Sequence, residues 1–253
     1  MTKDSKTFDE FYSLKNNKIC SIDEVINYSE SNNRNIEPYD QDMYCPECKK
    51  AKLTFVRKTK KKRAYLRKIP SSNHESGCSY NYEYVSNKTI NTIVHSMSNA
   101  EIDDRLNAMM NMLCKDTSAK NQSSNNEVTK SKNPMLIRRN TGKVIKTKAI
   151  PRKSLNCWVD HNENIYAYYG KKVKLKVVEK HKKSDGSIFY LLEIRTKNTK
   201  GEWNLKATIY RHKKPLDIDE NVLYNIAFIG FFDPEYEFSI RLLNWNALKY
   251  EIV

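Results

Sequence analysis

The chain has 253 residues, enough for one large domain or two small domains with buried cores. Its net charge of +15 favours polyanionic partners, chiefly nucleic acid, although an AT-rich coding sequence also enriches lysine. No apolar stretch is long enough to span a bilayer, and no signal-peptide core lies near the N-terminus. We therefore expect a cytoplasmic protein without membrane contact.

Residues 6–30 are predicted to form two short helices, followed by a polar loop at residues 31–42. The second helix has a clear start, because Ser21 and Glu24 form a capping-box pattern ahead of an apolar pair. These elements begin an N-terminal domain that we place at residues 1–114.

A metal-binding pattern follows in this domain. Cys45 and Cys48 form a Cys-Pro-Glu-Cys turn, and His74 and Cys78 come after a gap of 25 residues. Two ligand pairs of this kind supply a closed tetrahedral site, so we expect a structural Zn²⁺ ion, although the pattern does not distinguish zinc from iron. The alternative is that some of these cysteines are small buried apolar residues. The remaining three cysteines receive no role: Cys20, Cys114 and Cys157.

Two strand-like runs lie between the ligand pairs, at residues 52–57 and 63–69, and a basic segment separates them. This arrangement predicts a hairpin closed at its base by the metal, a zinc ribbon spanning residues 43–84. From Lys49 to His74 there are eleven Lys or Arg and no Asp or Glu, which suits phosphate contact with bases stacked on aromatic rings. The alternative is a solvated hairpin tip. The predicted nucleic-acid contacts here are Lys58, Lys60, Lys61, Lys62, Arg63, Tyr65 and Arg67.

Residues 44–84 resemble the N-terminal zinc-finger element of competence protein CoiA-like proteins. The resemblance rests on Tyr44-Cys45-Pro46-Glu47-Cys48, a β-hairpin, and then His74 and Cys78 a few residues apart. It implies a metal-binding role for Cys45, Cys48, His74 and Cys78, and a link to mobile-element or phage-related DNA biology. A clear nuclease core, which follows the element in that family, is missing from this sequence.

Residues 87–114 are predicted to be helical. Ser98 and Glu101 give a second capping box, and an apolar stripe follows at helical spacing. We expect this stripe to pack against the zinc element or the N-terminal helices; the alternative is a groove for a protein partner. The stripe consists of Ile102, Leu106, Met109, Met110 and Leu113.

A flexible basic linker is predicted at residues 115–154. Its first part, 115–133, is too polar to bury a core, and its second part, 134–153, carries seven Lys or Arg and no acid. We expect the second part to be extended or weakly paired.

Residues 155–253 are predicted to be all-β. Val173, Leu175 and Val177 alternate with lysines, Ser184-Asp185-Gly186 marks a hairpin turn, and further alternating runs follow. A small barrel of the OB type accounts for these strands. The predicted fold class is therefore α+β, with a helical zinc-ribbon domain before an OB-like barrel.

One outer face of this barrel is predicted to be basic. If the first strands pair as a meander, Arg195 and Tyr210 share that face with three lysines, in the way that small barrels bind nucleic-acid strands. The alternative is a plain solvated sheet, and Leu191 on the same side favours partial cover. The predicted contacts here are Lys174, Lys176 and Lys206.

A metal-dependent nuclease is the enzymatic alternative. Asp185 with Glu193 and Arg195 gives a distorted form of the Asp and Glu-x-Lys pattern that holds magnesium. Arginine replaces the lysine poorly, and Asp185 is already explained by its turn. The sequence therefore favours a non-enzymatic protein that binds nucleic acid, DNA in preference to RNA, through the backbone and with little sequence specificity. A subunit of a phage or defence assembly that binds a protein partner is the other alternative.

Overall fold

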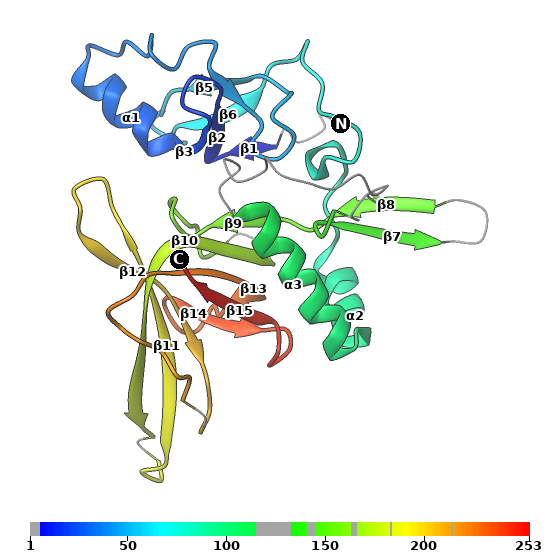
Figure 1. The fold of residues 1–253 in the computed structure, drawn as a ribbon, viewed down its shortest axis with the longest axis vertical. Helices are drawn as coiled ribbons and strands as arrows, with labels where there is room; N and C mark the ends of the chain where they lie inside the picture. Colours follow the sequence, from blue (N-terminus) through cyan, green and yellow to red (C-terminus); the bar gives the residue numbers. More distant parts are fainter. Residues whose placement is uncertain (1–5, 115–132, 141–144, 163–165, 183, 214) are drawn as a thin grey trace. The chain divides into compact units, whose positions relative to one another are not determined.

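The computed structural model describes the chain except residues 1–5, 115–132, 141–144, 163–165, 183 and 214. It divides into two compact units (Figure 1). Unit 1 comprises residues 1–83 and 115–149, and unit 2 comprises residues 84–114 and 150–253. Each has its own apolar core, and helices and strands occur together, so the α+β class is confirmed.

Unit 1 contains two small antiparallel sheets. The first has the order β3 (Lys18–Ser21), β2 (Glu10–Ser13), β4 (Met43–Tyr44). The second has the order β1 (Thr7–Phe8), β6 (Tyr65–Lys68), β5 (Leu53–Val56). The other elements are helix α1 (Ile22–Ser31), the short 3-10 helix η1 (Ser79–Asn81) and the hairpin of β7 (Leu136–Asn140) with β8 (Ile145–Ala149).

The prediction of two helices over residues 6–30 is wrong in its first half, where three short strands form. Phe8 and Phe11 are buried there because each is paired with a residue of a neighbouring strand, Phe8 with Leu66 and Phe11 with Cys20. Strand pairing, long-range for Phe8 and within the β2–β3 hairpin for Phe11, overrides a weak local pattern. The second half is confirmed, since α1 begins at the Ser21 capping box.

Unit 2 contains a closed barrel of five strands, which are labelled in Figure 1. They are β10 (Ala167–His181), β11 (Ile188–Lys197), β12 (Trp203–Tyr210), β13 (Tyr224–Phe232) and β14 (Ser239–Leu242). The barrel is closed because β13 pairs with both β14 and β10. Around the barrel the order is β10-β11-β12-β14-β13 and back to β10, with β12–β14 parallel and the other pairs antiparallel. Strands β9 (Arg152–Ser154) and β15 (Leu248–Ile252) extend the sheet beside β10 and β13.

The interior of the barrel follows from the alternation in the sequence. Val173 and Leu175 of β10 are buried with Leu192 and Ile194 of β11, so the intervening residues face outward. The Ser184–Asp185 turn joins these two strands, as the sequence predicts. The mostly β character of the C-terminal region is therefore confirmed.

Two helices precede the barrel in unit 2, α2 (Asn87–Ser96) and α3 (Asn99–Leu113). The capping box at Ser98 and Glu101 is present and separates them. The stripe of α3 is buried, but its predicted neighbours need correction: α3 lies against β13 and β15. The Lys249 ammonium lies 3.2 Å from the Asp103 carboxylate and ties β15 to the helix.

Most of the predicted 115–133 linker lies outside the described residues. In the basic segment after it, β7 (Leu136–Asn140) pairs with β8 (Ile145–Ala149), and Met135, Leu136 and Ile137 are buried. Among the described helices, none combines the length and apolar character needed to cross a bilayer.

Candidate metal centre

Four side chains from two distant segments meet in unit 1. The sulfurs of Cys45, Cys48 and Cys78 and one ring nitrogen of His74 all lie within 4.8 Å of one another. The Cys45 and Cys78 sulfurs are 3.9 Å apart, and His74 Nδ1 lies 3.5 Å from the sulfurs of Cys48 and Cys78. The predicted ligands therefore converge with their donor atoms facing a common centre, where a metal ion can bind.

The first ligand pair is shaped by a tight turn directly after β4. The Cys45 amide donates to the Ala51 carbonyl at 2.8 Å, and the Lys49 amide donates to the Cys45 carbonyl at 2.9 Å. Lys49 adopts a left-handed conformation with φ of 55°, which brings the chain back toward the cluster.

The second ligand pair sits in a loop fastened to the base of the β5–β6 hairpin. The Lys52 amide donates to the Ser72 hydroxyl at 2.8 Å, and the Lys68 ammonium donates to the Ser72 carbonyl at 2.5 Å. Gly77 then takes a positive φ of 85°, a conformation that a side chain would strain, just before Cys78. Both ligand pairs therefore depend on the same hairpin for their positions.

Aromatic rings hold the histidine ligand in place. The His74 ring stacks on Tyr80 at 5.8 Å between centroids and on Phe8 at 6.0 Å. Phe8 and Tyr80 also contact each other at 4.4 Å. The imidazole is thus fixed by packing, which orients its nitrogen toward the sulfurs.

Glu47, between the first two ligands, connects the two halves of the cluster. Its carboxylate accepts hydrogen bonds of 2.6 Å each from the Ser79 amide, the Ser79 hydroxyl and the Asn133 side chain. Asn133 also donates to the Gly77 carbonyl at 2.9 Å. The sequence did not predict that Glu47 and Asn133 would connect the ligand pairs. The only sign in the sequence is that Glu47 and its partner Ser79 lie next to ligands.

The thiol cluster has strongly perturbed pKa values. Burial raises the pKa of Cys45 to about 12, and hydrogen bonding to Cys45 and Cys48 raises that of Cys78. Hydrogen bonds from Cys45 and Cys78 lower the pKa of Cys48. The three sulfurs cannot all ionise together unless a cation compensates their charge, which is the behaviour expected of a metal-binding donor set.

The predicted nucleic-acid contacts of the hairpin surround its tip. Residues 57–63 are all exposed, and the Thr59 amide donates to the Lys62 carbonyl at 2.8 Å. The Thr59 hydroxyl accepts from the Lys62 amide at 3.1 Å and orders the turn. Lys58 pairs with Glu30 of α1 at 2.5 Å, whereas Arg67 is exposed and Tyr65 half-buried on β6.

The barrel candidates share a face only in part. Lys174 lies opposite Arg195 on β11, and its ammonium lies 5.1 Å from the Trp203 ring. The other two lysines have partners, Lys176 with Glu220 at 3.3 Å and Lys206 with the Cys157 carbonyl at 3.1 Å. This face is therefore less uniformly basic than the sequence suggests.

The residues of the nuclease alternative do not converge. Asp185 lies in the exposed β10–β11 turn, and Glu193 lies five residues beyond the start of β11, about 16 Å along the strand. The Glu193 carboxylate accepts from the Arg195 guanidinium at 2.8 Å. Its charge is therefore already compensated by an arginine.

Comparisons with protein-family models, with curated proteins and with solved structures give no match to this chain. The resemblance to the CoiA-like element stays a prediction.

Proposed function

We propose that the Cys/His cluster holds a structural zinc ion. In a tetrahedral site with Zn–S of about 2.3 Å and Zn–N of about 2.0–2.1 Å, sulfurs lie about 3.8 Å apart and S···N pairs about 3.5 Å apart. The separations of 3.9 Å and 3.5 Å between the ligand atoms agree with these values. Because four protein ligands fill the tetrahedron, the ion stabilises the fold of unit 1 without a position for substrate. On this proposal, β5, β6 and the two ligand pairs form a zinc ribbon.

The function that we propose for the whole chain is backbone-directed binding of nucleic acid. The observation that carries it is the ordered β5–β6 tip, which presents exposed Lys60, Lys61 and Lys62 on a hairpin anchored at the metal cluster. Fixed cations release condensed counterions when they neutralise phosphates, and they read little sequence. The excess of 45 basic over 30 acidic residues supports the same function.

The barrel supports a second binding module. In OB folds, a five-stranded Greek-key barrel binds oligonucleotides on the face of its second and third strands. Here, too, five strands close a barrel, the first three pair as a meander, and the third pairs with the fifth. We therefore propose an OB-like barrel whose β11–β12 face meets nucleic acid.

Two weak sites on one chain strengthen each other, because binding at one raises the effective concentration at the other. The resemblance of residues 44–84 to the CoiA-like element adds DNA from phages or mobile elements as the proposed context, with a cytoplasmic location. DNA is the proposed ligand in preference to RNA.

Fluorescence anisotropy with labelled 20-mers of single-stranded DNA, double-stranded DNA and RNA, over a salt series, tests this function. The decisive variant is Lys60→Glu/Lys61→Glu/Lys62→Glu. With single strands, we expect weaker binding to every sequence and a log–log salt slope shallower by roughly 2. Lys15→Glu/Lys18→Glu/Lys88→Glu is the matched control, since it changes net charge equally at exposed positions outside both proposed binding surfaces.

Two results contradict the proposal: negligible binding of all three probes at low salt, or equal losses in the tip variant and the dispersed control. Light scattering of the same samples tests the alternative that the chain is a subunit of a protein assembly. The apolar stripe of α3, which was the predicted partner groove, is already buried within the chain. Cleavage of DNA on addition of Mg²⁺, lost in Glu193→Ala, supports the nuclease alternative instead.

A further inference from the structure

Four rings from three parts of unit 2 form a continuous row, which we call the aromatic row: Phe189, Tyr210, His212 and Trp245. The centroids of successive rings lie 5.4 Å, 5.2 Å and 5.6 Å apart, with interplanar angles of 48°, 53° and 55°. These separations are those of aromatic rings in contact. The row therefore forms one connected aromatic surface.

The fold places the first three rings on the outside of the barrel. Leu192 and Ile209 are buried in its interior, so their neighbours Leu191 and Tyr210, which lie opposite each other, face outward. Phe189 lies two residues before Leu191 and shares its face. The Tyr190 amide donates to the His212 carbonyl at 2.8 Å and extends the β11–β12 ladder beyond Tyr210.

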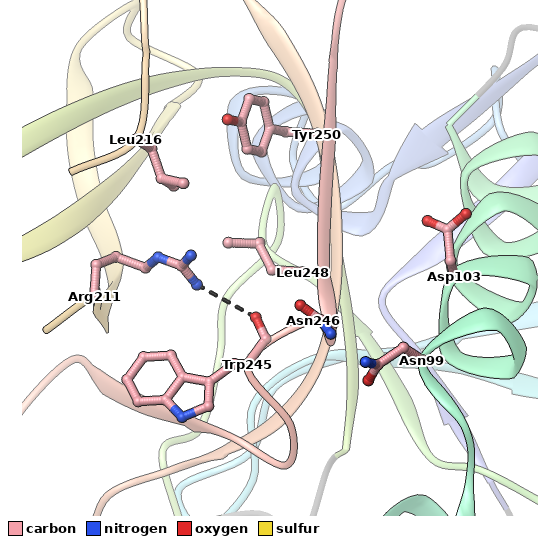
Figure 2. Close-up of a pocket in the computed structure, with 8 residues that line it drawn as sticks. All are labelled: Asn99, Asp103, Arg211, Leu216, Trp245, Asn246, Leu248 and Tyr250. Atoms are coloured by element: carbon pink, nitrogen blue, oxygen red, sulfur yellow. Dashed lines mark hydrogen bonds between the residues drawn. The ribbon is translucent and has the colours of Figure 1, made fainter. Parts of the chain in front are cut away.

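Trp245 completes the row from the β14–β15 turn. The Arg211 guanidinium donates to the Trp245 carbonyl at 3.5 Å and lies 5.9 Å from its ring, which fixes the turn beside β12 (Figure 2). Trp245 is nevertheless 54% exposed, and His212 is exposed as well. A ring this large and this exposed contributes little to the core, so its position suits contact with a ligand.

Two exposed lysines lie beside the row, in a segment with an excess of basic residues. Residues 171–213 contain 13 Lys or Arg and four Asp or Glu. Lys180 lies opposite Phe189 on β10, and Lys213 follows His212, both exposed. The nearest acid on β10, Glu179, accepts from the Tyr190 hydroxyl at 3.2 Å and lies 3.5 Å from His181. Aromatic faces flanked by cations complement bases joined by phosphates.

The row ends at a cavity of about 350 Å³, which Trp245 lines together with Arg211, Asn246, Tyr250 and two residues of α3. Figure 2 shows the Arg211 guanidinium and the Asn246 amide at this cavity. The Arg211 Nε atom is buried and has no hydrogen-bond partner among the described residues. The acid at the far side, Asp103, is compensated by Lys249. Such a cavity has the size and the donor groups for a single base or phosphate.

We propose that the aromatic row and the adjoining cavity bind a single strand of nucleic acid, with bases stacked on the rings and one nucleotide at Arg211. The proposal rests on the proposed nucleic-acid function but assigns a different contact. The lysines of the β5–β6 tip meet phosphates, whereas the row meets unpaired bases. Because every base has an aromatic face, the site accepts any sequence yet requires bases that are not paired in a duplex.

The experiment compares two labelled single-stranded 20-mers with equal phosphate charge, oligo(dT) and an abasic strand, against the full-length protein at one salt concentration. We expect at least 10-fold tighter binding of oligo(dT), since stacking requires the base. Trp245→Ala should weaken oligo(dT) binding roughly 10-fold and leave abasic binding unchanged, whereas Trp245→Phe should restore most of the loss.

Tyr236→Ala is the matched control, because Tyr236 is an exposed aromatic residue of the same unit outside the row, and it should behave as the unmodified chain. His212→Ala tests the row a second time if Trp245→Ala proves unstable by circular dichroism. Equal affinity for both strands, or equal losses for both in Trp245→Ala, overturns the base-stacking site while the backbone-binding function stands. Absence of binding to both strands overturns the two proposals together.

Discussion

The Glu47 carboxylate accepts hydrogen bonds of 2.6 Å from both the amide and the hydroxyl of Ser79. Glu47 lies between the first two ligands of the metal centre, and Ser79 directly follows the last ligand, Cys78. One carboxylate therefore sets the distance between ligand pairs that are about 30 residues apart in sequence. Partners of this kind orient ligands and commonly affect metal affinity strongly.

Replacing Glu47 by alanine should weaken metal binding by roughly 10- to 100-fold while the four ligands remain in place. The loss arises because the loop carrying His74 and Cys78 is no longer fastened to the first turn. Competition with a chromophoric zinc chelator measures the affinity. Glu75→Ala is the control, since Glu75 lies exposed between the second pair of ligands, and equal losses in the two variants contradict the role of Glu47.

Metal removal should unfold unit 1 and leave unit 2 largely intact, because the cluster ligands are shared between the turn after β4 and the loop beneath the β5–β6 hairpin. Elemental analysis of the purified chain should give one zinc per chain, and Cys45→Ser or His74→Ala should lower this value. Structural zinc contributes on the order of 10 kcal/mol to folding of small domains, so the thermal transition of unit 1 should disappear with a strong chelator.

Cys157→Ala is the control that keeps the metal. One iron per chain, or unchanged metal in both ligand variants, contradicts the assignment.

Alkaline pH should destabilise the chain through Cys20, a buried thiol outside the metal cluster. Burial raises its pKa from 9.0 to about 12. Between these values the unfolded chain loses the proton and the folded chain keeps it, so the stabilisation is complete below pH 9 and falls as pH rises toward 12. The guanidinium unfolding midpoint should therefore drop less between pH 8 and pH 10 in Cys20→Ala than in the unmodified chain. Parallel drops in both proteins contradict this role.

Local patterns in the sequence predicted the elements whose stability is local. The capping boxes at Ser21 and Ser98 depend on a residue three positions later, and both helices begin where these patterns place them. The alternation of Val173 and Leu175 with lysines likewise predicts a strand with one buried face. The Cys-x-x-Cys turn belongs to the same group, since it depends only on its own spacing. Its meeting with His74 and Cys78, in contrast, depends on the β5–β6 hairpin between the two pairs.

Features that depend on distant partners could not be predicted in this way. The strand at Phe8 exists because of its pairing with Leu66, and nothing near residue 8 indicates this. The spacing of the apolar stripe on α3 predicts that the stripe is buried. It does not predict its neighbours β13 and β15, because they lie more than 100 residues later in the chain. The contacts of Glu47 and the aromatic row also depend on residues that are distant in the sequence. In the row, for example, only the folded chain brings Tyr210 and Trp245 into contact with the same ring, that of His212.

Closure of the barrel should depend on a glycine at position 230. Gly230 of β13 pairs with Leu242 of β14, and a Cβ atom added there would lie 2.5 Å from the Arg241 carbonyl oxygen and 3.1 Å from Ile240. The nearest obstacle is backbone, so it can yield only if the two strands separate. Gly230→Ala should therefore destabilise unit 2 by roughly 1–3 kcal/mol, the usual cost of overpacking. Guanidinium unfolding followed by tryptophan fluorescence measures this loss.

Ser239→Ala, a change at a half-buried position of β14, is the control that should stay within about 0.5 kcal/mol of the unmodified chain. If Gly230→Ala unfolds at the same guanidinium concentration as this control, the β13–β14 contact is not the tight closure of the barrel that the geometry indicates.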